Sequence, residues 1–203
     1  PGLSSQQQQD EIIAILDQAK AIQLNAIILQ VRPSADAIYP STLEPWTEYL
    51  NGEQGRAPQV WYDPLQFWIT QAHQRGLELH AWFNPYRAKT ALSKANLSPQ
   101  HVSNRKPSAV KKYGDLLWMD PSDADAATQT LNVIMDVVRR YDIDGVHIDD
   151  YFYPYPIKDA AGQEVDFPDE ENWVRYQNEG GALARADWRR QHAQSEPCAG
   201  PSP

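Results

Sequence analysis

Three short apolar segments, each preceded by a stretch of helical length, most constrain the fold of this 203-residue chain. The segments cover residues 26–31, 77–83 and 145–149, and the amphipathic stretches before them cover about 5–22, 63–76 and 122–141. Strands that alternate with helices are typical of βαβ units and a parallel sheet. The sequence therefore predicts an α/β protein.

The polar residues of the three segments follow one alternation phase, because successive side chains of a strand point to opposite faces. One face is predicted to carry Ile28, Gln30 and Arg32, then His80, Trp82 and Asn84, then Gly145, His147 and Asp149. An open sheet covered by helices on both sides would be apolar on both faces. A TIM-type barrel instead turns polar toward its catalytic rim, at the carboxyl ends of the strands. The pattern favours the barrel.

The remaining segments give weaker signals. Residues 34–62 and 88–114 are predicted as loops, the second one solvated, and residues 116–119 as a short extended piece. Ser122 is the predicted N-cap of the helix that follows, and a final helix is predicted over about 170–191.

The segment 144–156, D-G-V-H-I-D-D-Y-F-Y-P-Y-P, says most about function. A carboxylate at the end of a strand, followed by an aromatic loop, suits a site that holds a sugar ring. Tyr151, Phe152, Tyr153 and Tyr155 are predicted to form a stacking surface beside the acid. The alternative is a surface turn with ordinary aromatic packing.

Composition and missing motifs exclude several function classes. The net charge of -9 argues against a nucleic-acid partner. Cys198 is the only cysteine, which excludes an internal disulfide framework and a cysteine-based zinc site. No apolar run reaches membrane-spanning length, and no signal peptide is visible. No G-x-G-x-x-G motif or P-loop follows a strand, so we expect no cofactor.

Five segments together resemble a known bacterial family. They are L-N-A-I-I-L-Q-V-R-P (24–33), Y-D-P-L (62–65), G-L-E-L-H-A-W-F-N-P-Y-R (76–87), W-M-D-P (118–121) and Y-D-I-D-G-V-H-I-D-D-Y-F-Y-P-Y-P (141–156). In order and spacing they are similar to the glycosyl-hydrolase-like 10 family, formerly domain of unknown function 187. The resemblance covers about residues 2–190.

The resemblance implies a (β/α)8 barrel that acts on bacterial glycan, with peptidoglycan strands as the substrate class. It also implies export of full-length relatives, as periplasmic, lipoprotein or extracellular proteins. A full barrel takes about 250 residues. We therefore expect residues 1–190 to be the N-terminal part of such a barrel, with about three of eight strands. Residues 191–203 are expected to be a disordered or non-family tail, and the chain by itself an inactive fragment.

The resemblance also suggests roles for individual residues. The family's nucleophile, at the end of the fourth barrel strand, falls on Asp149, which alternation independently turns inward. Asp150 is the second catalytic candidate. Because alternation turns it away from Asp149, we expect it to cap the next loop or to orient Arg32 or Tyr153. The substrate-binding candidates are Arg32, His80, Trp82, Asn84, Tyr86, Arg87, His147, Tyr151 and Tyr153.

Two other functions stay open. The first is a glycan-binding module or pseudoenzyme without a second catalytic acid. The second is a metal-dependent hydrolase with ligands from His80, His147, Asp149 and Asp150. The absence of an H-x-H or H-E-x-x-H pair makes the metal hypothesis the weaker one. The sequence does not define the oligomeric state.

Overall fold

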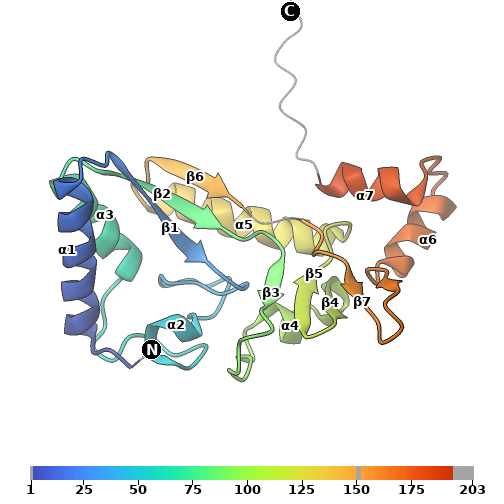
Figure 1. The fold of residues 1–203 in the computed structure, drawn as a ribbon, viewed down its shortest axis with the longest axis horizontal. Helices are drawn as coiled ribbons and strands as arrows, with labels where there is room; N and C mark the ends of the chain where they lie inside the picture. The colour runs from blue at the N-terminus through green and yellow to red at the C-terminus, as the bar shows by residue number, and fades with distance from the viewer. Residues whose placement is uncertain (1, 150–151, 194–203) are drawn as a thin grey trace, which may run out of the picture.

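A parallel sheet lies at the centre of the computed structural model, which describes residues 2–149 and 152–193. Strand β1 (Ala26–Arg32) pairs with β2 (Glu78–Phe83), and β2 pairs with β6 (Gly145–Ile148), in both cases in parallel. Figure 1 shows the strands side by side, with their carboxyl ends at one edge. The predicted α/β architecture with a parallel sheet is confirmed.

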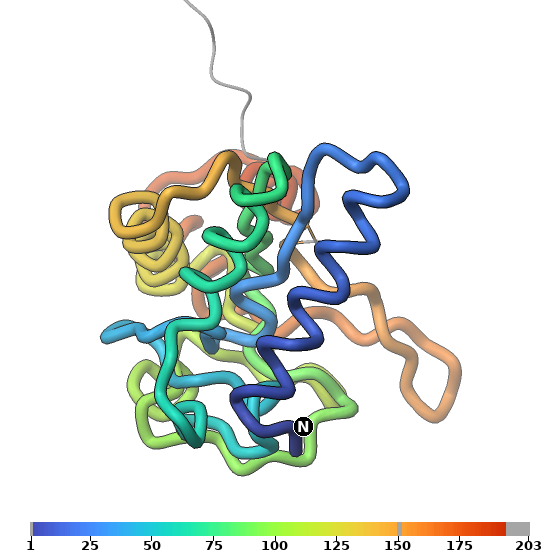
Figure 2. Tube along the Cα trace, turned by 90° about the vertical axis from the view of Figure 1, so that its left-hand side faces the viewer, coloured from blue at the N-terminus to red at the C-terminus, as the bar shows by residue number. Residues whose placement is uncertain are grey.

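Helices cover one face of this sheet. They are α1 (Ser5–Ala21), α3 (Pro64–Gln74) and α5 (Ala124–Arg140), and Figure 2 shows their traces one beside the next. The side chains that meet between helices and sheet are at most 1% exposed: Leu16, Ile69, Val137, Leu79, Ala81 and Phe83. Removal of this apolar surface from water is the main contribution to the stability of the layer.

Polar caps set the starts of the helices. Asp63 caps α3 as predicted, because its carboxylate accepts a backbone N–H of the first turn at 3.1 Å and Pro64 follows it. The prediction of Ser122 as the cap of α5 is wrong by one residue. Asp123 accepts two backbone N–H groups there at 2.8 and 3.1 Å, whereas the Ser122 hydroxyl donates to Asp120 at 2.6 Å.

The two faces of the sheet follow the predicted alternation except at Arg32, because a bulge after Gln30 pairs Arg32 with Phe83 and takes it out of the predicted phase. Leu79, Ala81 and Phe83 of β2 are fully buried under the helices, whereas His80 and Trp82 are only half-buried on the opposite face. Strand β6 keeps this register, because its residues pair with those of β2 in sequence from His80 to Phe83. It lies at one edge of the sheet, and its helix-side residues Val146 and Ile148 are 42% and 49% exposed.

A second, antiparallel sheet follows β2. It consists of β3 (Arg87–Lys89), β5 (Leu116–Met119) and β4 (Val110–Tyr113), in the order β3-β5-β4. Helix α4 (Val102–Arg105) and the 3-10 helix η1 (Pro107–Ala109) belong to the same insertion. The prediction of a solvated loop over 88–114 is wrong, because scattered apolar residues such as Val102 and Ala109 are buried against Met119. The extended piece at 116–119 is confirmed as β5.

Two further segments, residues 33–63 and the stretch after β6, contain only short elements. Residues 33–63 form a long connection that contains the short helix α2 (Glu48–Asn51), which Thr47 caps. After β6 the chain forms a hairpin of β7 (Ile157–Lys158) and β8 (Glu164–Val165).

Two short helices replace the single helix predicted over 170–191. They are α6 (Glu170–Asn178) and α7 (Arg185–Ala193), and Gly180, with a φ of 88°, lies in the break between them. Figure 1 places both at the opposite end of the molecule from α1. The predicted boundary at residue 190 falls inside α7, and residues 194–203 lie outside the described residues, so the predicted tail stays a prediction.

Candidate active site at the carboxyl ends of the parallel strands

The candidate site lies where β1, β2 and β6 end, because the carboxyl ends of parallel strands meet at one edge of a sheet. Its floor is the sheet face opposite the helices. Arg32 ends β1, Asn84 follows β2, and Asp149 follows β6. The three strand ends that the alternation pattern selected thus lie at the same edge.

His80, Trp82 and His147 come together on this face. The rings of Trp82 and His147 are edge to face, with centroids 5.9 Å apart. His80 lies over Gly145, where a Cβ atom would be 2.6 Å from the imidazole Nδ1. Glycine at this position therefore allows the histidine to lie flat on β6, and His80 also bonds Glu78 at 3.0 Å. The predicted grouping of these residues on one face is confirmed.

Asp149 is the first residue after β6 and is exposed to solvent. It lies two residues beyond His147, at the carboxyl edge of the sheet. Asp150 and Tyr151, the other acid and one stacking candidate, lie outside the described residues. Their predicted roles stay predictions, as does the assignment of Asp149 as nucleophile.

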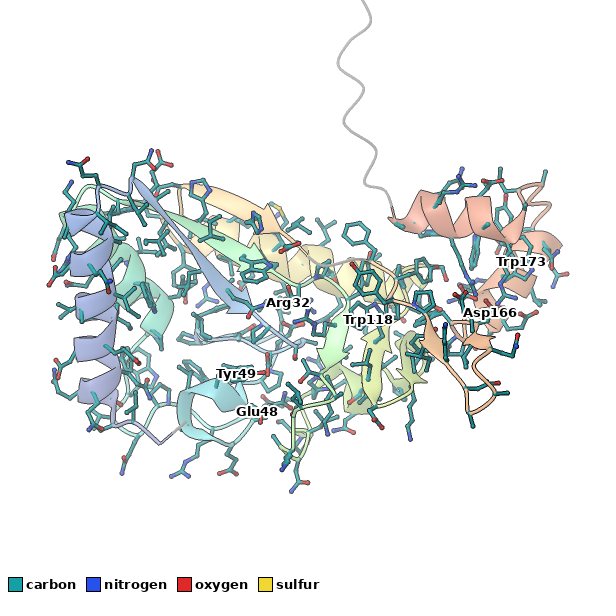
Figure 3. All side chains as sticks on the ribbon, in the orientation of Figure 1. Arg32, Glu48, Tyr49, Trp118, Asp166 and Trp173 are labelled. Atoms are coloured by element: carbon teal, nitrogen blue, oxygen red, sulfur yellow. The ribbon has the colours of Figure 1, made fainter. Side chains whose placement is uncertain are left out.

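Arg32 occupies a structural position instead of the predicted substrate contact. Its side chain is fully buried and bonds Glu44 through Nε at 2.8 Å and Nη2 at 2.5 Å. Nη1 donates to the carbonyl oxygens of Asn84 and Pro85 at 2.7 and 2.8 Å. Figure 3 shows Arg32 near the carboxyl end of β1, beside the small sheet that carries Trp118. Arg32 therefore fastens the β1 and β2 ends to the loop that holds Glu44.

The charge state of Arg32 is fixed by this pair. Burial by itself would lower the pKa of the guanidinium, but the charge of Glu44 and its hydrogen bonds outweigh burial and raise that pKa. The site edge thus contains a buried charge that Glu44 compensates within the protein.

Asn84 and Trp82 leave polar atoms unsatisfied. The Asn84 amide donates to the carbonyl oxygen of Pro33 at 3.1 Å, and the residue is fully buried. Within the described part of the chain, neither Asn84 Oδ1 nor Trp82 Nε1 has a hydrogen-bond partner, although both atoms are buried. A buried acceptor and a buried donor without partners on one face are unfavourable unless a ligand or water satisfies them.

Tyr86 and Arg87 lie in the connection from β2 to the small sheet. The Tyr86 ring packs edge-on against Phe152 at 5.4 Å, and burial raises the pKa of its hydroxyl. Arg87 opens β3, opposite Trp118 of β5, and is half-buried. Both predicted candidates are thus beside the loop that follows Asp149.

Tyr153 faces the protein instead of the predicted open stacking surface. Its ring packs edge-on against Phe167 at 5.3 Å, and the Arg189 guanidinium lies 5.9 Å from the ring centroid. The ring packs against a small aromatic core of Tyr113, Trp118 and Phe167, each of which is less than 7% exposed. Of the two described tyrosines of the loop, Tyr155 is the exposed one, at 67%.

Three buried carboxylates near the strand ends were not among the predicted binding residues. Glu44 pairs with Arg32, as described above. Asp120 accepts hydrogen bonds from Ser122 and from the Asn172 amide. Asp36 is 1% exposed, and burial raises the pKa of its carboxyl group to about 7. An acidic residue among apolar and proline neighbours, as in T-L-E-P-W, is the one sequence signal that indicates Glu44.

The described residues hold neither a metal-binding cluster nor a membrane-spanning helix. No group of three or more His, Cys, Asp or Glu side chains in residues 2–149 and 152–193 is arranged to hold a metal ion. None of the helices in the same ranges combines the length and the apolar content that a membrane span requires.

The fold is that of an α/β protein whose parallel sheet carries polar residues at the carboxyl ends of its strands. The structure is similar to alpha-L-fucosidase isoenzyme 2 from Paenibacillus thiaminolyticus, with a TM-score of 0.54 and 13% identity over 93% of this chain and 25% of that one. It is also similar to a hypothetical protein from Ruminiclostridium thermocellum, with a TM-score of 0.50 and 14% identity over 87% of each chain. At these identities the likeness concerns the fold alone.

Sequence comparison shows the family. Residues 2–195 match the family model for glycosyl hydrolase-like 10, and the chain belongs to this family. Glycosyl hydrolase YngK of Bacillus subtilis (strain 168) is 46% identical over 191 residues, which cover 93% of this chain and 36% of that protein. Glycosyl hydrolase DigH of Escherichia coli (strain K12) is 34% identical over 197 residues, 92% of this chain and 42% of that protein. The chain thus spans about two fifths of the length of these relatives.

Proposed function

We propose that this chain forms the first part of a (β/α)8 glycoside hydrolase that acts on bacterial glycan, with peptidoglycan strands as the substrate. One observation carries the proposal. His80, Trp82 and His147 meet on the sheet face opposite the helices, and Asp149 follows β6 at the carboxyl edge of the sheet. This is the edge at which α/β barrels carry their chemistry.

Asp149 is the proposed nucleophile. Its carboxylate attacks the anomeric carbon while a second carboxyl group donates a proton to the glycosidic oxygen that leaves. Water then breaks the glycosyl–enzyme bond, and the second group takes back a proton. In such a retaining mechanism the two carboxyl groups are about 5–5.5 Å apart. We propose that the second group lies on a strand that follows this chain in its full-length relatives, which we expect to be exported.

The floor of the site supplies groups that position the sugar. Trp82 Nε1 is a buried donor and Asn84 Oδ1 a buried acceptor without partners in the described residues. Sugar hydroxyl groups both donate and accept hydrogen bonds, so they are the kind of partner that each of these atoms lacks. His147 lies against Trp82, two residues before Asp149. From there it can form a hydrogen bond with the nucleophile or with a sugar hydroxyl group.

The test is a substitution in a full-length relative. Asn in place of the aspartate that aligns with Asp149 keeps the shape but removes the charge that attacks and stabilises the oxocarbenium-like state. We expect turnover of uncrosslinked glycan strands to fall by several orders of magnitude, with folding and strand binding retained. The matched control is the position of Asp142, which is 94% exposed at the other end of β6. Retention of more than about a tenth of wild-type turnover would contradict the assignment.

For residues 1–203 by themselves we expect glycan binding without measurable cleavage. The chain holds Asp149, whereas the proposed acid lies outside it. The same strands, assayed beside the relative, test this expectation. Robust cleavage by the chain would mean that both catalytic groups lie within it, and Asp150, Glu44 and Asp120 would then be the acids to substitute first.

A further inference from the structure

A groove lies beside the loop that follows Asp149. It encloses about 290 Å³ and is lined by Arg87, Leu116, Trp118 and residues 154–157. One wall comes from the small antiparallel sheet, and the other from the aromatic loop. Pockets of roughly 300–1,000 Å³ hold drug-sized ligands, so this volume suits a single sugar ring.

The groove is held open by contacts on both sides of the loop. The Trp118 indole donates from Nε1 to the carbonyl oxygen of Phe152 at 2.7 Å. Beyond the groove, the backbone N–H of Ile157 donates to the Tyr113 hydroxyl at 3.1 Å. The Phe152 ring is also fixed, edge-on to Tyr86 at 5.4 Å. The loop is therefore anchored by hydrogen bonds before and after Tyr155.

Tyr155 is presented to solvent on a stiff piece of backbone. It is 67% exposed and lies between Pro154 and Pro156, whose rings fix their own φ angles and restrict the residue before each. A tyrosine in an ordinary loop would lose backbone freedom when it binds a ligand. Here most of that freedom is already absent, so the exposed ring is preorganised for a flat partner.

The lining combines an aromatic face with a fork of N–H donors. A pyranose ring has a flat C–H face that an aromatic side chain can cover, and hydroxyl groups at its rim that accept hydrogen bonds. Arg87, half-buried at the start of β3, is one of the residues that line the groove. Trp118 is only 3% exposed and forms the base rather than a stacking face.

We propose that this groove is a sugar-binding subsite, in which one pyranose ring of the glycan stacks on Tyr155 and its hydroxyl groups accept from Arg87. The subsite rests on the proposed function, because it holds a ring of the same chain that Asp149 would cleave. It makes Tyr155, and not the inward-facing Tyr153, the stacking residue of the loop. It also implies that the substrate is an extended glycan that passes beyond the cleavage point.

The test uses residues 1–203 and soluble peptidoglycan glycan strands freed of peptide. We expect Tyr155→Ala to weaken binding roughly tenfold, the scale of one aromatic stacking contact, and Tyr155→Phe to stay within about twofold of wild type. Trp61→Ala is the matched control, because Trp61 is equally exposed at 68% but lies over α3, outside the groove. In NMR titrations the indole N–H resonance of Trp118 should shift with added glycan, and that of Trp61 should not.

The outcomes separate the subsite from the catalytic proposal. Equal binding by Tyr155→Ala and wild type, an equal loss in Trp61→Ala, or no binding by the unsubstituted chain would each overturn the subsite. The Asp149 substitution in the relative decides the nucleophile independently, since it is read out as turnover. If Tyr155→Ala weakens binding while the relative cleaves no glycan, the subsite stands and the hydrolase proposal fails.

Discussion

Glu44→Gln should be among the most destabilising single substitutions in this chain. The change replaces a carboxylate by a neutral amide of nearly the same shape. It leaves the guanidinium of Arg32 fully buried without its counter-charge, where both groups are at most 1% exposed. The guanidinium does not escape the loss by giving up its proton, because the ordinary pKa of arginine lies far above neutral pH.

The contacts of the pair set the expected magnitude. Removal of one partner from a buried ion pair typically costs 3–5 kcal/mol, because the remaining charge is uncompensated. Two of the guanidinium contacts, to the carbonyl oxygens of Asn84 and Pro85, survive the substitution. We therefore expect a loss near the lower end, ~3 kcal/mol, which is a large share of the 5–15 kcal/mol that a typical domain has.

Urea unfolding of residues 1–203, followed by far-UV circular dichroism, measures this loss. Glu53→Gln is the matched control, because Glu53 and Arg56 form a pair 3.5 Å apart that is 69% and 60% exposed. Such surface pairs contribute about 0–1 kcal/mol. A loss of less than about 1 kcal/mol in Glu44→Gln would refute the reasoning and reopen Arg32 as a group that can face a ligand.

Two further predictions concern buried carboxylates. Burial raises the pKa of Asp36 from 3.8 to about 7, so its ionisation opposes folding. The contribution of Asp36 to the free energy of unfolding should decline by up to roughly 4 kcal/mol as the pH rises from about 4 to 7. Urea unfolding measured at several pH values should show a flatter dependence of stability on pH in Asp36→Asn than in the unsubstituted chain. Parallel pH profiles would contradict this. Burial alone would raise the pKa of Asp169, but hydrogen bonds from Arg189 and Arg185 lower it. Asp169→Asn should therefore lower the free energy of unfolding by ~2–4 kcal/mol. It should also make the hairpin at 159–166 more sensitive to limited proteolysis, and an unchanged cleavage pattern would refute this prediction.

The parallel sheet could be predicted because its pattern is local. Alternation in 26–31, 77–83 and 145–149 depends only on side-chain period, and the paired residues up to Gln30, Phe83 and Ile148 lie in the predicted phase. Arg32 does not, because a bulge after Gln30 shifts the register. His80, Trp82 and His147 were found together for this reason. The Gly145 position also fits, because a strand glycine often marks a close approach of another group.

The loops could not be predicted, because their contacts join residues far apart in sequence. Nothing local tells that Arg32 reaches Glu44 across twelve residues and Pro85 across more than fifty. The same applies to Tyr153, whose place is set by Phe167, and to the region 88–114, where sparse apolar residues find partners only after the small sheet forms. Polar residues at strand ends can bind substrate or fasten loops, and only tertiary contacts distinguish these roles.

The candidate site therefore has two parts, and the contacts within this chain hold one of them more firmly in place than the other. The groove at Tyr155 is fixed by hydrogen bonds at 2.7 and 3.1 Å that lie wholly within the described residues. Asp149 instead follows β6, which is an edge strand here, with Val146 and Ile148 still 42% and 49% exposed on its helix side. A nucleophile must be held to within about 0.5 Å, which an edge strand paired on one side does not ensure. For this reason we expect the chain to bind glycan through its groove, and the reaction to require a protein in which β6 is paired on both sides.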